Sequence, residues 1–328
     1  MSPNNLATMN KKKLILLLAF LFTLLTMASC SPSSPASVQE QSEGKLNIVA
    51  TTSIVGDVVS QVGGDNIHLS VLLPAGSDPH SFDPTPQDIA KAAGADLIFA
   101  NGAGLETFLE NLIESAGAQD SVVYVSSGID FLIIGEDEQN DKLEGDDHQQ
   151  TPNTADPHTW TDPNNILVWI RNIEGKLSEA DPNNSAEYAA NAARFEAEIK
   201  ALDAWVREQT AQIAPEDRKL VSDHSMFNYF ADEYGFEQVG ALIPGYSSLA
   251  EPSAQELAVI EDAISKFNVK AVFVGNTVNP ALAERAAEDS GVALVYLYTG
   301  SLSEPGGEAD TYLQYIRYNV SAIVDALK

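Results

Sequence analysis

Three of the five histidines in this chain lie in loops from which they could bind a metal ion. His80 follows the segment LLPAGSDP, His158 lies in DPHTWTDP, and His224 lies in VSDHSMF, directly after a predicted strand. Neutral imidazole is a good ligand for zinc and related first-row ions, and three imidazoles form a recognised zinc-binding set. Their spacing matches no local metal-binding motif, so a shared site requires the fold to bring them together.

Each of these histidines has an aspartate close by in the sequence: Asp78, Asp156 or Asp223. Such a carboxylate can accept a hydrogen bond from the ring N–H that a metal ion leaves available, which orients the ring. The same residues also form turns and cap helices, so both roles remain open. Prolines beside His80 and His158 stiffen these two loops and reduce the ordering cost of binding a cation.

The elements that must position these loops alternate between strand-like and helix-like patterns. Short β-branched runs predict strands at 46–51, 67–73, 96–100 and 121–125, with helices at 54–62, 86–94 and 105–115. The pattern returns with strands at 219–223, 237–242, 269–274 and 293–297, and helices at 227–234, 253–267, 280–290 and 309–327. This alternation predicts an α/β fold with two mostly parallel sheets, each of about four strands. His80 and His224 then follow strand ends, where open α/β sheets bind their ligands.

A long helical pattern at 181–214 separates the two halves. Asp181 is a good N-cap and Pro182 a good first helical residue, and neither glycine nor proline follows up to Ala214. One apolar stripe runs along this segment: Tyr188, Ala192, Phe195, Ile199, Leu202, Val206 and Ile213. A helix of about 30 residues is about 45 Å long, enough to reach across both halves. A surface helix within one half is the alternative.

The N-terminus has the features of a secretory signal peptide. Three lysines at 11–13 precede an apolar run over 14–25, and small residues follow. As a helix the stretch from Leu14 to Met27 is about 21 Å long, too short to cross a hydrocarbon core of about 30 Å. The segment MASC at 27–30 resembles the lipobox of bacterial lipoproteins, which implies that residues 1–29 are removed and that Cys30 is lipidated. Residues 30–44, rich in Ser, Pro and Gln, are predicted to be a flexible tether.

The composition excludes some classes of protein. The chain has 47 Asp plus Glu against 18 Lys plus Arg, a formal net charge of −29, which argues against a nucleic-acid-binding protein. Its single cysteine excludes an internal disulfide and a cysteine-based zinc cluster. An acidic stretch at 136–155 is predicted to be a solvated loop, with the collection of cations as the alternative.

Five segments together resemble the metal-binding subunits of zinc and manganese ABC transporters, the cluster A-I substrate-binding lipoproteins. They are LLPAGSDPHSFDPTPQD at 72–88, ADLIFANGAGLE at 95–106, DPHTWTDPNN at 156–165, DHSMFNYFADEYGF at 223–236 and LSEPGGEADTYLQYIRYN at 302–319. The resemblance implies two α/β lobes joined by one rigid helix, with a metal site in the cleft between them. The N-terminal lobe is then expected at 45–180, the linking helix at 181–214 and the C-terminal lobe at 215–328.

The resemblance also implies a set of metal ligands. His80 and His158 match the two histidines of the family's N-terminal lobe. His224 matches the third ligand, which is histidine in zinc-type members and glutamate in many manganese-type members. The family's fourth ligand is an aspartate, but Gly300 stands at that position and offers no side-chain ligand. A water molecule or a carboxylate from another loop, such as Glu251, can take its place.

These expectations combine into one function, that of a monomeric receptor anchored to the outside of the cytoplasmic membrane, at the cell surface or in a periplasm. It is expected to capture a divalent cation and deliver it to an ABC permease and its ATPase. Zn²⁺ is favoured over Mn²⁺ because a third imidazole is softer than a carboxylate. Since binding needs neutral imidazoles, the affinity is expected to fall below about pH 6.5.

No enzymatic activity is expected, because the sequence contains neither an H-E-x-x-H motif nor a nucleophile elbow. Two alternatives from other classes stay open. One is a two-lobed receptor for an organic ligand that has lost metal binding. The other is a secreted zinc hydrolase, which the vacant fourth ligand position makes conceivable.

Overall fold

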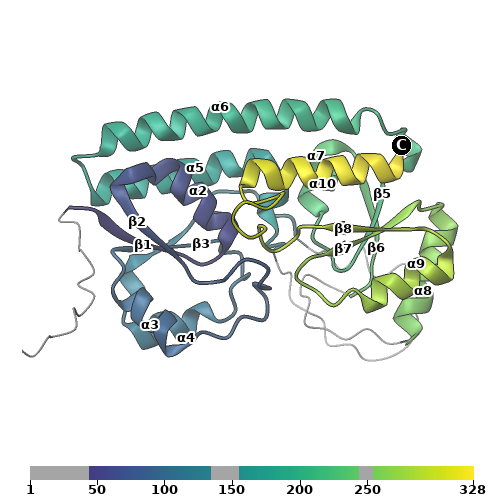
Figure 1. The fold of residues 1–328 in the computed structure, drawn as a ribbon, viewed down its shortest axis with the longest axis horizontal. Coiled ribbons are helices and arrows are strands. Elements are labelled where there is room, and N and C mark those ends of the chain that lie inside the picture. The colour runs from purple at the N-terminus through teal and green to yellow at the C-terminus, as the bar shows by residue number, and fades with distance from the viewer. Residues whose placement is uncertain (1–43, 134–154, 244–253) are drawn as a thin grey trace, which may run out of the picture. The chain divides into compact units, whose positions relative to one another are not determined.

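The computed structural model describes residues 44–133, 155–243 and 254–328, which form two sets of alternating strands and helices (Figure 1). The first set contains β1 (Leu46–Ala50), α2 (Ser53–Gly63), β2 (Ile67–Val71), α3 (Pro86–Ala93), β3 (Leu97–Ala100), α4 (Leu109–Ala116), β4 (Val122–Tyr124) and α5 (Pro163–Ala180). After α6 (Ser185–Thr210), the second set contains β5 (Lys219–Ser222), α7 (Asn228–Tyr234), β6 (Glu237–Ala241), α8 (Ala254–Phe267), β7 (Ala271–Gly275), α9 (Ala281–Ser290), β8 (Ala293–Leu297) and α10 (Tyr312–Leu327). Cys30 and its predicted tether, nearly all of the acidic stretch, and Glu251 lie outside the described residues.

The two sets form two four-stranded sheets that share one strand order. The first sheet has the order β2-β1-β3-β4 and the second has the order β6-β5-β7-β8. All pairings between these strands are parallel. Parallel neighbours need crossover connections, and helices supply most of them. The predicted fold class, two α/β lobes that each contain a four-stranded parallel sheet, is confirmed.

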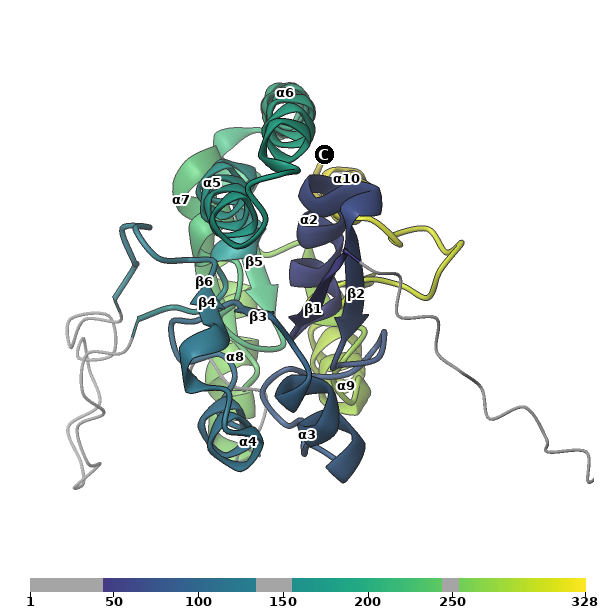
Figure 2. The same ribbon diagram turned by 90° about the vertical axis from the view of Figure 1, so that its left-hand side faces the viewer.

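Alternate residues of the central strands face two different cores. In β1, Ile48 packs with α2, α5 and α6, whereas Val49 packs with α3 and α4 on the opposite face. In β7, Phe273 joins the same core as Ile48, whereas Val272 packs with α8 and α9. One continuous core therefore lies between both sheets and the helices α2, α5, α6, α7 and α10, while each sheet has a separate core on its other face (Figure 2).

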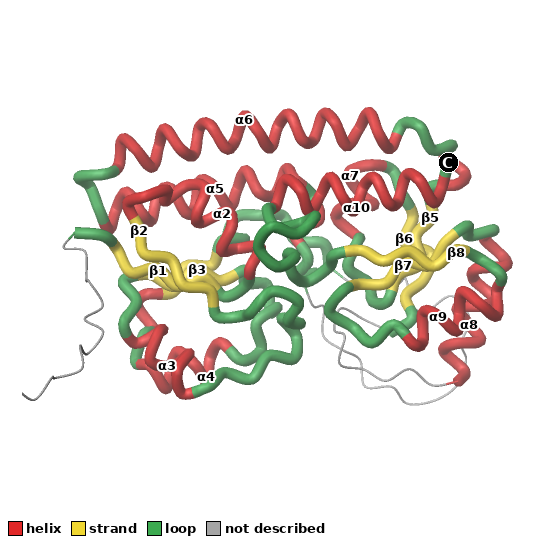
Figure 3. The backbone as a smooth tube through the Cα atoms, in the orientation of Figure 1, coloured by secondary structure: helices red, strands yellow, loops and turns green. Residues whose placement is uncertain are grey.

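The long helix α6 lies along helices of both sets (Figure 3). It packs against α2 and α5 of the first set and against α10 of the second. Asn191 Nδ2 donates to Val62 O at 3.2 Å, and Tyr234 OH of α7 donates to Asp203 Oδ1 at 2.9 Å. The helix therefore makes contacts across both halves, as its predicted length suggested.

The predicted start of this helix at Asp181 is wrong, because Asp181 ends the preceding helix. Its N–H donates to Leu177 O at 2.8 Å. Its carboxylate accepts hydrogen bonds from Asn184 Nδ2 at 2.6 Å and from Tyr188 OH at 3.1 Å. Asp181 thus joins two helices through a short turn, and α6 begins only at Ser185.

The preceding helix, α5, is absent from the sequence-based prediction although its signals are present. Asp162 is its N-cap and accepts from Asn164 N at 2.8 Å, and Pro163 is its first residue. Its buried residues recur at helical spacing: Ile166, Trp169, Ile170, Ile173 and Leu177. This helix fills an interval, 163–180, to which the prediction assigns no element.

Residues 45–328 form one compact unit, so the lobe boundaries at 180 and 215 stay a prediction. Among the helices of the described residues, none combines the length and the apolar character needed to cross a bilayer.

Candidate metal centre

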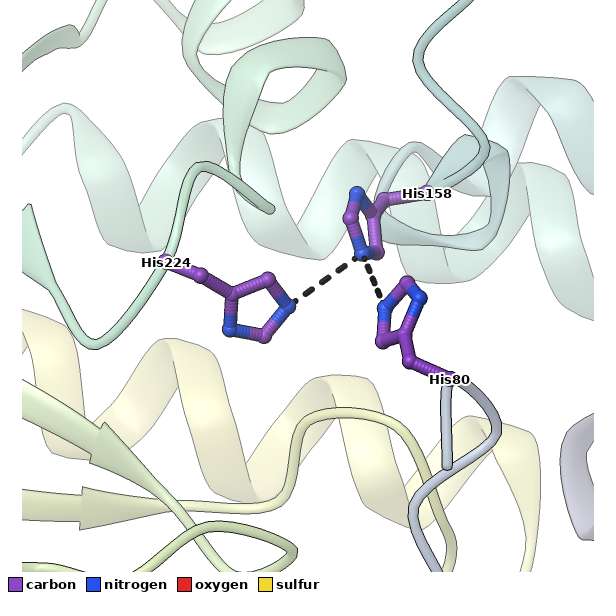
Figure 4. A group of neighbouring side chains, drawn as sticks. All are labelled: His80, His158 and His224. Atoms are coloured by element: carbon purple, nitrogen blue, oxygen red, sulfur yellow. Dashed lines mark hydrogen bonds between the residues drawn. The ribbon is translucent and has the colours of Figure 1, made fainter. Parts of the chain in front are cut away.

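Three loops bring the three predicted histidines to one point. His80 lies between β2 and α3, His158 precedes a short 3-10 turn that leads into α5, and His224 lies two residues beyond β5. All three are buried, with relative exposures of 7%, 1% and 3% in that order. The rings come from both sets of elements and point toward one another (Figure 4).

The Nε2 atoms of these rings are spaced as a shared cation requires. His158 Nε2 lies 3.3 Å from His80 Nε2 and 3.3 Å from His224 Nε2. The candidate ligand atoms of all three residues lie within 4.8 Å of one another, which no other trio of His, Cys, Asp or Glu achieves in the described part of the chain. Tetrahedral ligands at a zinc–nitrogen distance of about 2.0–2.1 Å are about 3.4 Å apart. The two spacings from His158 therefore fit one tetrahedral ion, and the third pair, His80 and His224, lies within 4.8 Å.

Carboxylates orient two of the three rings. His158 Nδ1 lies 2.8 Å from Asp156 Oδ1, and His224 Nδ1 lies 2.7 Å from Asp223 Oδ1. A carboxylate only accepts, so each Nδ1 carries the proton of a neutral ring and each Nε2 presents a lone pair. Two lone pairs facing each other at 3.3 Å cannot form a hydrogen bond with each other. A cation between them satisfies both.

Further hydrogen bonds hold the two orienting carboxylates in place. Asp156 Oδ2 accepts from Asn228 Nδ2 at 3.1 Å, a contact from the first set of elements to α7 of the second. Asp223 Oδ2 accepts from Gly275 N at 2.7 Å at the end of β7. Both predicted roles are therefore found in these two aspartates, because each Oδ1 also accepts from the backbone N–H of its histidine, at 2.9 Å for His158 and 2.7 Å for His224.

Asp78 follows the alternative prediction, that of a turn former. Its Oδ1 accepts from His80 N at 3.0 Å and its Oδ2 accepts from Ser81 Oγ at 3.2 Å. The His80 side chain is thus positioned through its backbone, whereas the other two rings are oriented through their own nitrogens.

The surroundings of His80 and His158 keep these two rings neutral. Burial, together with the neighbouring His158 and His224, lowers the pKa of His80 to about 2. Burial also lowers the pKa of His158, and the carboxylate of Asp156 partly opposes this effect. Desolvation disfavours the charged form of a base, so His80 and His158 carry available lone pairs at neutral pH.

Gly300 lies directly against the loop that carries His80. A Cβ atom placed on Gly300 would lie 2.8 Å from Pro79 Cδ and 3.2 Å from Pro79 Cγ. Atoms this close must move apart, so the backbone approach depends on glycine at this position. Gly300 thus leaves no room for a side-chain ligand and brings the second set of elements against the His80 loop.

Trp160 also belongs to this centre, although the sequence indicates it only as one residue of the segment DPHTWTDPNN. Its ring packs edge-on against His158, with the ring centroids 5.2 Å apart. Its Nε1 donates to Thr299 O at 3.2 Å, beside Gly300 in the second set. The repeated Asp-Pro steps around Trp160 mark a stiff loop, but the sequence holds no signal for its partner 139 residues away.

Comparison with known families identifies one family over most of the chain. The family described as zinc-uptake complex component A, periplasmic, matches residues 48–326. The chain is 31% identical over 317 residues to the manganese-binding lipoprotein MntA of Halalkalibacterium halodurans, covering 96% of this chain and 99% of that protein. It is 29% identical over 323 residues to the manganese ABC transporter substrate-binding lipoprotein PsaA of Streptococcus pneumoniae, with the same coverage.

Solved structures with the same fold include proteins described for two different metals. The periplasmic zinc-binding protein TroA of Treponema pallidum superposes with a TM-score of 0.75 at 26% identity, covering 87% of this chain and 99% of that chain. A Mn-bound periplasmic metal-binding protein of Candidatus Liberibacter asiaticus superposes with a TM-score of 0.73 at 25% identity, covering 86% of this chain and 99% of that chain. The similarity therefore extends over both sets of elements and spans both metals.

Proposed function

The chain belongs to the zinc-uptake complex component A family, and we propose that it is the metal-binding receptor of an ABC importer, with His80, His158 and His224 as its metal ligands. The observation that carries this proposal is the convergence of three Nε2 atoms, with His158 Nε2 3.3 Å from each of the other two. The names of the relatives, which are substrate-binding lipoproteins of metal and manganese ABC transporters, support the transport role. The protein would act as a receptor and not as an enzyme, with the cation as its cargo.

We propose Zn²⁺ as the preferred cargo and Mn²⁺ as a weaker one. Manganese favours carboxylate, carbonyl and water oxygens, whereas imidazole suits zinc. The proposed set has three imidazoles, and Gly300 supplies no carboxylate. The nearest acids, Asp156 and Asp223, accept hydrogen bonds from the rings and so orient the ligands. Relatives are named for both metals, so the proposal of Zn²⁺ rests on the ligand types of this chain and not on the names of its relatives.

The receptor is further proposed to be a monomer anchored by a lipid on Cys30, outside the cytoplasmic membrane, and to deliver its cation to a permease driven by an ATPase. The lipobox-like segment at 27–30 and the lipoprotein names of the relatives support the anchor. A Cys30→Ala form should leave the membrane fraction once its signal peptide is cut. Retention of that form in the membrane would contradict the anchor and leave the metal site untouched.

Calorimetric titration of a soluble form, residues 31–328, tests the receptor function. We expect one Zn²⁺ per chain and weaker binding of Mn²⁺. A protein with His80, His158 and His224 all replaced by alanine should bind neither ion. His68→Ala is the matched control, because His68 is an exposed histidine on β2 outside the group. Equal zinc binding in the triple variant would contradict the proposed site, and tighter binding of Mn²⁺ than of Zn²⁺ would reverse the proposed cargo.

A further inference from the structure

A buried glutamate, Glu106, lies at the carboxyl end of the first sheet. Its side chain is 7% exposed and follows β3 in the segment ANGAGLE. Its Oε1 accepts from Thr51 Oγ1 at 2.7 Å and from Asn101 N at 2.6 Å, and its Oε2 accepts from Gly102 N at 3.1 Å. Burial raises the pKa of the Glu106 carboxyl above its ordinary value, although the hydrogen bonds from these neighbours partly oppose this shift. A buried carboxylate with donors on both oxygens is expected to have a defined task.

The first link from Glu106 runs to the loop that carries His80. Thr51 is the residue after β1, and its carbonyl accepts from Leu73 N at 3.0 Å. Leu73 lies just beyond β2, where the chain leaves the sheet for the His80 loop. By holding the Thr51 hydroxyl, Glu106 fixes the strand end from which this loop departs.

The second link runs to the loop that carries His158. Glu106 fixes Asn101 through its backbone N–H, and Asn101 Nδ2 donates to Pro157 O at 3.0 Å and to Gly102 O at 2.8 Å. Both neighbours of this amide nitrogen are carbonyls, which fixes the orientation of the amide. Asn101 Oδ1 is buried without a hydrogen-bond partner among the described residues. The Asn101 side chain therefore makes its hydrogen bonds through Nδ2. One of these bonds holds Pro157, which immediately precedes His158.

We infer that Glu106 is a positioning residue for the metal centre, which fixes the His80 and His158 loops relative to each other from one buried carboxylate. The inference rests on the proposed function, because it assigns Glu106 a role in the affinity of the three-histidine site. Both links consist of hydrogen bonds shorter than 3.2 Å between buried groups, so a small displacement of the carboxylate reaches both loops. His224 has its own support in the second sheet and does not depend on this carboxylate.

Glu106→Gln is the central variant, because it keeps the size of the side chain and replaces one acceptor oxygen by a donor. In either orientation its amide nitrogen faces a backbone N–H, that of Gly102 or that of Asn101, and this donor–donor contact displaces the side chain that makes both links. Supporting groups outside the metal ligands typically contribute 10–100-fold in metal affinity, and we expect the lower end, about tenfold weaker Zn²⁺ binding. The absorption spectrum of the Co²⁺-loaded protein should also change, because it reports the geometry of the ligand nitrogens.

Asp57→Asn is the matched control. Asp57 is another acid of the first set whose pKa burial raises, and its Oδ2 accepts from Tyr312 N at 2.8 Å. Its hydrogen-bond partners Tyr312 and Gln61 belong to α10 and α2 and not to either histidine loop. This variant should lower the melting temperature and leave both the Zn²⁺ affinity and the Co²⁺ spectrum as in the unaltered protein.

Two single-link variants make the inference independent of the folding of Glu106→Gln. Thr51→Val removes the link toward His80, and Asn101→Ala removes the side-chain bonds to Pro157 and Gly102 while leaving the backbone bond to Glu106. Each should weaken Zn²⁺ binding less than Glu106→Gln does, and each should alter the Co²⁺ spectrum. The inference is overturned if all three variants bind Zn²⁺ as tightly as the unaltered protein and with its Co²⁺ spectrum. A failure of the unaltered protein to bind Zn²⁺ would instead contradict the proposed function itself.

Discussion

The two sheets share one strand order but support their histidines in different ways. The second sheet presents His224 two residues after β5. The adjacent Asp223 accepts a hydrogen bond from the His224 ring nitrogen Nδ1, and it also accepts one from the backbone N–H of Gly275 in the neighbouring strand β7. The first sheet presents two histidines on longer loops that meet only through tertiary contacts. The short turn after β5 thus fixes its ring by local geometry, whereas the first sheet needs long-range hydrogen bonds to fix its loops.

The three rings divide in a different way from the two sheets. His158 and His224 are each oriented by a carboxylate at Nδ1, whereas His80 is fixed through its backbone N–H and by the packing of Pro79 on Gly300. His158 and His224 therefore form the better-ordered pair, and His80 completes the set from the loop that depends most on its surroundings. Substitutions at each ring and at its supporting residues test this difference.

Removal of His158 should have the largest effect on metal binding, because its Nε2 lies 3.3 Å from both other Nε2 atoms. We expect His158→Ala to weaken Zn²⁺ binding by more than about 100-fold, beyond the range for supporting residues. Competition with a chelator of known affinity measures the change. A loss of less than tenfold would mean that His80 and His224 bind the ion without it.

Removal of the carboxylates should have the next largest effect. Asp156→Asn and Asp223→Asn should each weaken Zn²⁺ binding by about 10–100-fold, because the amide no longer selects the Nδ1–H form of the ring. Asp78→Asn should have a smaller effect, since its carboxylate accepts from a backbone N–H and a serine hydroxyl. Equal effects of the three variants, measured by the same competition, would remove the distinction between the rings.

Gly300→Ala should weaken Zn²⁺ binding by up to about tenfold, because its Cβ would lie 2.8 Å from Pro79 Cδ and displace the His80 loop. Overpacking of this kind costs about 1–3 kcal/mol of stability. Gly175→Ala is the control: the site lies within α5 with no atom near its added Cβ, and it should stabilise the helix by up to about 1 kcal/mol. Titration and thermal unfolding separate the two outcomes. Unchanged affinity in Gly300→Ala would show that the Pro79 contact does not bear on the site.

The smallest effect should come from pH. If all three rings had the ordinary pKa of about 6.5, the Zn²⁺ affinity would fall by about 1000-fold between pH 7.5 and 5.5. Burial lowers the pKa of His80 to about 2 and also lowers the pKa of His158, so over this range both rings carry less proton than ordinary histidines. We therefore expect a fall of no more than about tenfold. Titrations at several pH values measure this, and a 1000-fold fall would contradict the neutral rings.

The sequence predicts the regular elements better than it predicts the connections between them. The eight strands appear within one or two residues of their predicted bounds, because β-branched runs between turn residues determine them locally. The helix predicted at 105–115 begins only at Leu109, because the Glu106 side chain accepts from the backbone of Asn101 and Gly102 in the preceding turn. Asp181 carries the signals of a helix start but ends a helix, since its carboxylate bonds forward to Asn184 and Tyr188.

The candidate site follows the same division. The residue types of the three histidines and the aspartates beside them indicate a metal site, and the strand ends place two of the histidines. The contact between Gly300 and Pro79 and the bond from Trp160 to Thr299 join segments more than 130 residues apart. Such contacts depend on how the two sheets pack against their shared helices, which local sequence patterns do not record.

The most direct test of the central claim is X-ray absorption at the zinc edge of the soluble protein loaded with one Zn²⁺. We expect three imidazole nitrogens at about 2.0–2.1 Å from the zinc ion, and we expect any remaining ligand to be an oxygen atom. The spectrum of the His224→Ala protein should lose one imidazole. An ion surrounded mainly by oxygen atoms, or an unaltered number of imidazoles in that variant, would contradict the convergence of the three rings on one cation.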